Sequence, residues 1–143
     1  MKYLMILLFI PLIMFSQERY VKGYIYIEDE FIPIPTVEIM DTNNKLITET
    51  DTNGYFTFKL NDSNKTFFTQ YPGLQKEEVN VIEESDLVYI FMITYPIIDF
   101  VSLKKAQRII RKDRRKLLKK IYPEAIKRGV IPKGILFNKQ KLD

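Results

Sequence analysis

Short runs of strand-forming residues, several of which alternate apolar and polar positions, are separated by turn-forming residues and constrain the fold of this chain more than any other feature. Seven such runs, of five to eight residues each, lie at 20–27, 36–40, 45–50, 55–60, 66–71, 76–82 and 87–93. They are rich in β-branched and aromatic residues, and no helical periodicity separates them. This spacing favours an antiparallel sandwich over a parallel α/β sheet. We therefore expect residues 17–95 to be mainly β, a seven-strand antiparallel β-sandwich.

The same alternation indicates which side chains form the core. Successive residues of a strand point to opposite faces of the sheet, so the apolar positions of these runs cannot all face one core. The residues expected to include most of the core anchors are Val37, Ile39, Phe56, Phe58, Val79, Val81, Tyr89 and Phe91.

The first 16 residues have the pattern of a secretory signal peptide. Lys2 precedes 13 residues, 3–15, that are apolar or proline, and Ser16 is small enough to precede a cleavage site. The run is shorter than the roughly 20 residues of a membrane-spanning helix, although an uncleaved anchor is the alternative. The chain has no cysteine and so no disulfide. We expect an exported protein of the periplasm or cell surface.

The stretch TETDTNGYFTFKL holds a cluster of turn-forming residues between two strand-like runs. Asn53 and Gly54 both tolerate a positive φ, which is typical of a tight hairpin turn. Asp51 and Asn53 also resemble part of a calcium loop, but Leu60 stands where an EF-hand has its bidentate glutamate. We therefore predict that residues 51–54 form a hairpin turn and hold no metal.

Four stretches in chain order, VKGYI, PIPTVEI, TETDTNGYFTFKL and YPGLQKEEVNV, carry a family pattern. The matching residues are Gly23, Pro33, Pro35, Thr50, Asp51, Asn53, Gly54, Phe56, Tyr71, Gly73, Glu78 and Val79. With them, residues 19–92 resemble the carboxypeptidase regulatory-like domain, a transthyretin-like (Ig-like) seven-strand sandwich common in exported proteins of Bacteroidota. Thr36 and Leu74 depart from the pattern at loop positions, where the family has glycine and an aromatic residue. The resemblance implies a non-catalytic accessory module without catalytic residues of its own.

The residue types present exclude several kinds of chemistry. The chain has no histidine and no cysteine, which removes imidazole and thiolate zinc sites, Ser-His-Asp and Cys-His arrangements and thiol redox pairs. Carboxylates remain, most densely at Glu28, Asp29 and Glu30, where we expect a solvated loop. We predict a protein that is not an enzyme and has no catalytic residues, metal or cofactor. The alternative is a small envelope hydrolase using carboxylates on peptide or glycan.

The charge of the chain is divided between its two parts. Residues 17–101 carry 6 basic and 15 acidic residues, net −9, whereas residues 102–143 carry 15 basic and 3 acidic residues, net +12. Such a division indicates two parts with different partners. We expect residues 96–143 to be a basic, helical C-terminal tail.

Within this tail, residues 102–122 have the pattern of an amphipathic helix with Ser102 as its N-cap. The predicted apolar stripe is flanked by Leu118 and interrupted by Arg114, and it consists of Leu103, Ala106, Ile110, Leu117 and Ile121. Pro123 suits the first position of a second, shorter helix, and Gly129 suits its end. Residues 130–143 are expected to be loosely ordered.

The cations of this helix are the candidate functional residues. Either the helix packs on the sandwich and its cations are only solvated, or the basic face contacts an anionic membrane surface or an acidic envelope protein. We do not expect nucleic acid as a partner of an exported chain, and the oligomeric state is open. The candidate contacts with an anionic surface are Arg108, Arg111, Lys112, Arg115, Lys116, Lys119 and Lys120.

Overall fold

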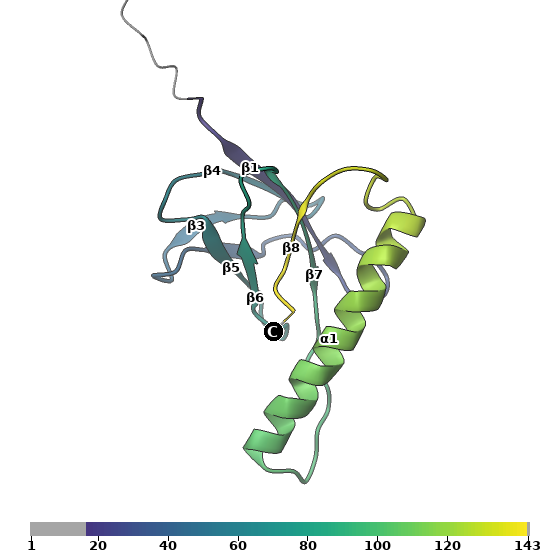
Figure 1. Cartoon of the computed structure of the whole chain (residues 1–143). Helices are drawn as coiled ribbons and strands as arrows, with labels where there is room; N and C mark the ends of the chain where they lie inside the picture. The colour runs from purple at the N-terminus through teal and green to yellow at the C-terminus, as the bar shows by residue number, and fades with distance from the viewer. Residues whose placement is uncertain (1–16, 143) are drawn as a thin grey trace, which may run out of the picture.

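The protein has three layers, formed by two β-sheets and one long helix (Figure 1). The computed structural model describes residues 17–142, so the predicted signal peptide at residues 1–16 lies outside the described residues. The elements in chain order are β1 (Tyr20–Ile27), β2 (Glu38–Met40), β3 (Leu46–Glu49), β4 (Tyr55–Lys59), β5 (Thr66–Gln70), β6 (Glu77–Asn80), β7 (Leu87–Met92), α1 (Leu103–Lys127) and β8 (Asn138–Lys139). Sheet A has the order β4-β1-β7-β8 and sheet B the order β3-β2-β5-β6.

The mainly β class and the C-terminal helix are as predicted, and each of the seven predicted strands is present within two residues of its expected bounds. Two details of the prediction are wrong. An eighth strand, β8, comes from the segment expected to be loose, and the sheets are not purely antiparallel. β7 pairs in parallel with both β1 and β8.

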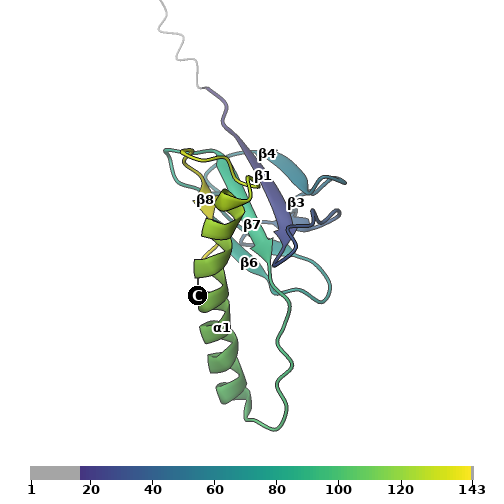
Figure 2. The ribbon, with the colours of Figure 1, turned by 90° about the vertical axis from the view of Figure 1, so that its right-hand side faces the viewer.

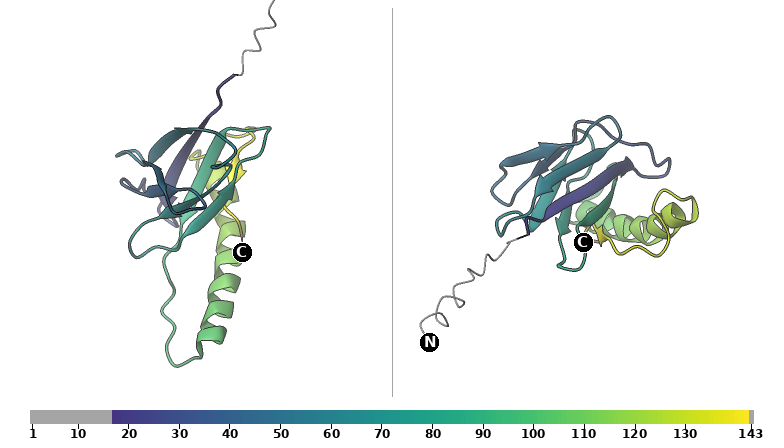
Figure 3. Two further views of the ribbon diagram at one scale, coloured as in Figure 1. Left: turned by 90° about the vertical axis from the view of Figure 1, so that its left-hand side faces the viewer. Right: turned by 90° about the horizontal axis from the view of Figure 1, so that it is seen from above.

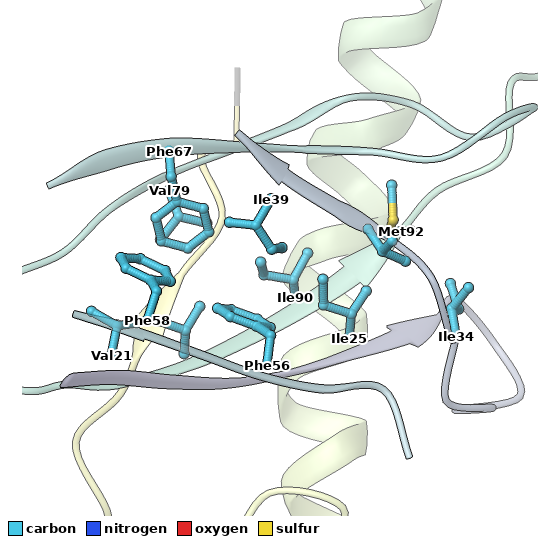
Figure 4. Close-up of a cluster of buried hydrophobic side chains, with 12 residues drawn as sticks. Val21, Ile25, Ile34, Ile39, Phe56, Phe58, Phe67, Val79, Ile90 and Met92 are labelled. Atoms are coloured by element: carbon cyan, nitrogen blue, oxygen red, sulfur yellow. The ribbon is translucent and has the colours of Figure 1, made fainter. Parts of the chain in front are cut away.

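Strand β7 is central because it is buried on both faces. Val88, Ile90 and Met92 point into the inner core between the two sheets, where Figure 4 shows Ile90 and Met92 among side chains of both sheets. Tyr89 and Phe91 point to the opposite face, into an outer core between sheet A and α1. This explains why the strand reads as a continuous apolar run rather than an alternating one.

Most of the predicted core anchors are buried, but they divide between the two cores. The inner core contains Val37, Ile39, Phe56, Phe58 and Val79, with Val81 partly buried against it, whereas Tyr89 and Phe91 belong to the outer core. Gly23 of β1 makes room for the ring of Phe56, because a Cβ on Gly23 would lie 2.3 Å from the Phe56 Cζ.

Residues 51–54 form a turn, but not the predicted hairpin. Gly54 has a φ of +69°, and Asp51 Oδ1 accepts hydrogen bonds from the backbone N–H groups of Asn53 and Tyr55 at 2.8 and 3.0 Å. However, β3 pairs with β2 in sheet B, and β4 pairs with β1 in sheet A. The turn therefore carries the chain from one sheet to the other, because the apolar faces of β3 and β4 cover the inner core from opposite sides.

Helix α1 is one continuous helix of 25 residues that includes Pro123, so the predicted break before Pro123 is wrong. Pro123 lacks the N–H for one helical hydrogen bond, a loss of about 3 kcal/mol in a helix interior. Buried residues on both sides of it, Tyr122 and Ala125, hold the two parts of the helix against the same sheet face. Gly129, with a φ of +77°, follows the end of the helix as predicted.

Candidate functional site

The two halves of α1 have different surroundings. The C-terminal half lies on the outer face of sheet A, where Leu118, Ile121, Tyr122 and Ala125 are buried (Figures 1 and 3). The N-terminal half extends beyond the end of the strands, and the loop after β7 follows it (Figure 2). A helix of 25 residues is about 37 Å long at 1.5 Å per residue, so half of it is enough to cover the sheet.

The predicted apolar stripe overlaps the face that packs on the sandwich only in the C-terminal half of α1, where Leu117 is also partly buried. Of its five residues only Ile121 is buried, and Leu103 is 77% exposed. The buried face instead contains Arg114, Leu118, Ile121, Tyr122 and Ala125. Arg114, which interrupts the stripe predicted from the sequence, is buried in the structure because it pairs with the carboxylate of Glu77.

Arg114 forms a buried ion pair with Glu77 of β6, whose side chain is fully buried. Arg114 Nη1 donates to Glu77 Oε1 at 2.6 Å, and Nη2 donates to Glu77 Oε2 and, at 2.6 Å, to the carbonyl oxygen of Lys141. Burial raises the pKa of Glu77, and the Arg114 guanidinium opposes this rise. The pair joins α1, sheet B and the C-terminal segment at one point and fixes the position of the helix on the sandwich.

The C-terminal segment is ordered on β7, which corrects its prediction as a loose tail. The side chain of Gln140 donates from Nε2 to Phe91 O at 2.6 Å and accepts from Phe91 N at Oε1 at 2.7 Å. Asn138 Nδ2 donates to the carbonyls of Ser85 and Leu87 at 2.9 and 3.0 Å. The segment was missed because it has no apolar alternation. The polar side chains of Asn138 and Gln140 and the separate apolar residues Ile131 and Phe137 hold it in place.

The predicted cations lie on the exposed faces of α1, opposite and beside the buried face. A shallow furrow of about 460 Å³ runs along the helix, which we call the basic furrow. Its residues recur at three- and four-residue intervals, so they form one stripe: Lys104, Gln107, Arg108, Arg111, Lys112, Arg115, Lys116 and Lys119. Six of the seven predicted contacts are in this set.

Lys120, the seventh predicted contact, lies on another side of the helix. It lines a groove of about 350 Å³ between α1 and the end of β7, where Glu28 and Asp113 are also found. Sequence reasoning missed Lys104 and Gln107, although both fall at helical spacing from Arg108 and Arg111.

A second feature that sequence reasoning missed lies just before the helix. We call residues 95–103 the apolar tip, because they form the loop that runs from the end of β7 to the start of α1, where the projection ends (Figure 2). Ile97 is 93% exposed, and Phe100 and Leu103 are also exposed. The signal available in the sequence was the run PIIDFVSL directly before a basic helix.

Two of the carboxylates considered for catalysis or metal binding, Glu28 and Asp51, have partners within the protein. Glu28 accepts hydrogen bonds from Thr94 N and Thr94 Oγ1 at 3.1 and 2.6 Å, and Asp51 caps the turn described above. Among residues 17–142, no three histidine, cysteine or carboxylate side chains are grouped as metal ligands would be. Within the same range, no helix has the length and apolar character to cross a membrane.

Comparison with protein-family models and with curated proteins gives no match. The resemblance to the carboxypeptidase regulatory-like domain therefore rests on the sequence motifs alone.

Proposed function

We propose that this chain is an exported, non-catalytic binding module of the cell envelope whose basic furrow contacts an anionic partner. The observation that carries the proposal is an exposed basic stripe along α1, beside the patch that is buried on the sandwich. One face is buried on sheet A through Leu118, Ile121 and Tyr122. The basic furrow carries six of the seven predicted cations on a helix whose C-terminal half is held against the sheet.

The rigidity of the helix supports this role. A flexible basic tail loses conformational freedom when it binds, whereas a helix held by a buried ion pair and an apolar core has already lost it. Each lysine or arginine near an anionic membrane surface contributes about 1 kcal/mol, so the seven cations of the furrow suffice for reversible binding. Such binding weakens as ionic strength rises, because the Debye length falls to about 8 Å at 0.15 M.

The non-catalytic role is supported by the residue types and by the engagement of the carboxylates. The chain lacks histidine and cysteine, and Glu28, Asp51 and Glu77 are committed to backbone groups, Thr94 or Arg114. The motifs shared with the carboxypeptidase regulatory-like domain support the same conclusion, since that family has accessory modules of this kind.

The test compares two variants with the same net charge. The furrow variant carries Arg108→Gln, Arg111→Gln and Lys112→Gln, and the control carries Lys22→Gln, Lys45→Gln and Lys133→Gln, all exposed and outside the furrow. At low salt, the native protein and the control should retain acidic components of the envelope fraction, whereas the furrow variant should not. Equal retention by the two variants would show that net charge, and not this face, drives the contact.

A further inference from the structure

The apolar tip is a projection in which several large apolar side chains are exposed to solvent. Ile97 is 93% exposed and Leu103 is 77% exposed, and the Phe100 ring is fully in solvent. A soluble protein rarely leaves several large apolar side chains together at one protruding point unless they have a contact to make.

Backbone conformation adds to this observation. Phe100 has a φ of +60°, a left-handed conformation that a bulky side chain rarely adopts. Such strain costs free energy and clusters at sites where it serves a function. Here it turns the chain from the loop into α1 and directs an aromatic ring away from the sandwich.

Cations adjoin the tip on the helical side. Lys104, Lys105 and Arg108 follow Leu103 within two turns, and all three are exposed. Asp99 is the one acidic residue of the tip, and these cations outnumber it. An apolar end bordered by lysine and arginine complements a surface that has anionic groups above an apolar interior.

We propose that the anionic partner of the furrow is a lipid bilayer and that the apolar tip inserts Ile97, Phe100 and Leu103 below the headgroups. This inference rests on the proposed function and names the partner of that same face. The shape of the tip favours lipid over protein. A stable interface between two folded proteins buries roughly 800 Å² of each partner, and a convex point offers too little area for this. A fluid bilayer, in contrast, can surround such a point on all sides. Insertion orients α1 so that the cations nearest the tip reach the headgroups.

The absence of tryptophan from the chain permits a direct test. Phe100→Trp places the only indole of the protein at the tip, and Tyr20→Trp places it on β1, at the other end of the sandwich, as the matched control. Each variant is mixed at low salt with vesicles of phosphatidylcholine and phosphatidylglycerol, and separately with phosphatidylcholine alone. With the mixed vesicles, the emission of Phe100→Trp should shift to the blue and be quenched by lipids brominated in their acyl chains, and the control should show neither change.

A second variant measures the contribution of the ring. Phe100→Gly removes the ring and suits the left-handed conformation, so the protein should fold at least as well. Its affinity for the mixed vesicles should fall about tenfold or more, as expected for the loss of one buried aromatic side chain.

The outcomes separate the inference from the proposed function. Salt-sensitive vesicle binding without a spectral shift, or with an unchanged affinity of Phe100→Gly, would overturn insertion and leave the electrostatic contact. Capture of an acidic envelope protein without binding to any vesicle would overturn the lipid partner alone. Failure to bind any anionic surface at low salt would overturn both proposals.

Discussion

At the scale of single residues, two glycines with similar backbone conformations have different surroundings. Gly54 has a φ of +69°, and a Cβ added to it would lie 2.4 Å from the carbonyl oxygen of Ile25. Gly73 has a φ of +81°, and an added Cβ would meet nothing within 4 Å. The positive φ at Gly54 was foreseeable from Asn53-Gly54 between two strand runs. The close approach of Ile25 was not, because only the tertiary fold brings β1 beside this turn.

These two glycines separate conformational strain from steric clash. Gly73→Ala should destabilise the protein by about 1 kcal/mol, the cost of a left-handed conformation for a residue with a Cβ. Gly54→Ala should cost at least about 2 kcal/mol, because the methyl group also displaces the backbone of β1. Urea denaturation of both variants measures the difference between their free energies of unfolding. Equal values would mean that the backbone of β1 moves away from the added methyl group without a cost in free energy.

At the scale of elements, the attachment of α1 depends on a charge inside the fold. Arg114 was read from the sequence as an interruption of the apolar stripe, yet it is 7% exposed and paired with the fully buried Glu77. The helical pattern around Arg114 contains no information about Glu77, which lies 37 positions earlier in the sequence. Only the packing of α1 across the edge of the sandwich supplies the partner that makes burial of an arginine tolerable.

Replacing Arg114 alone should destabilise the protein far more than replacing both Arg114 and Glu77. Arg114→Leu should cost about 3–5 kcal/mol in the free energy of unfolding, because Glu77 is left buried without its partner. The double variant with Glu77→Leu should recover most of this loss. Arg111→Leu, an exposed position on the same helix, serves as the control and should lie within about 0.5 kcal/mol of the native protein.

The stability of the single variant Arg114→Leu should depend on pH. In Arg114→Leu the main influence that opposes the effect of burial is lost and only the Gln140 side chain still opposes it, so the pKa of Glu77 in the folded state rises further above its ordinary value of 4.5. The folded state then binds a proton that the unfolded state releases, and stability falls as pH rises above 4.5 toward the folded pKa. The deficit should be smaller at pH 5 than at pH 7, and a deficit independent of pH would contradict this origin.

The C-terminal segment depends in a similar way on one polar side chain. Gln140→Ala leaves the N–H and carbonyl of Phe91 without their partners in a buried site, so it should cost about 2–3 kcal/mol. Gln107→Ala, an exposed glutamine of α1, is the matched control and should change stability little. Equal melting temperatures of the two variants would mean that water replaces Gln140 at the edge of β7.

At the scale of the whole molecule, residues 96–143 are structurally part of the same folded body as the sandwich. α1 covers Tyr89, Phe91 and Ile93 on the outer face of sheet A. Ion pairs between the two oppositely charged parts include Arg114 with Glu77 and Lys141 with Glu78. Because ion pairs contribute little net free energy, apolar burial supplies most of the docking energy.

A chain that ends at Val101 should therefore be a poor test of the basic helix. Without α1 and β8 it exposes the outer core and the edge of β7, so we expect a lower melting temperature, binding of an apolar dye and self-association in size-exclusion chromatography. A monomeric truncated chain with the native melting temperature would show that the sandwich does not need the helix. Point variants in the full chain avoid this ambiguity.

The sequence by itself determined the strands, the turn at Gly54, the helix and the gathering of cations on it, because these follow from alternation, turn chemistry and helical spacing within a few residues. The tertiary structure alone decided which strands pair, that Pro123 lies inside one helix, and that Asn138 and Lys139 form an eighth strand. It also decided that the side chain of Arg114 is buried between α1 and the sandwich and that the side chain of Phe100 is exposed to solvent. These outcomes depend on partners distant in the sequence, and local pattern carries no information about such partners.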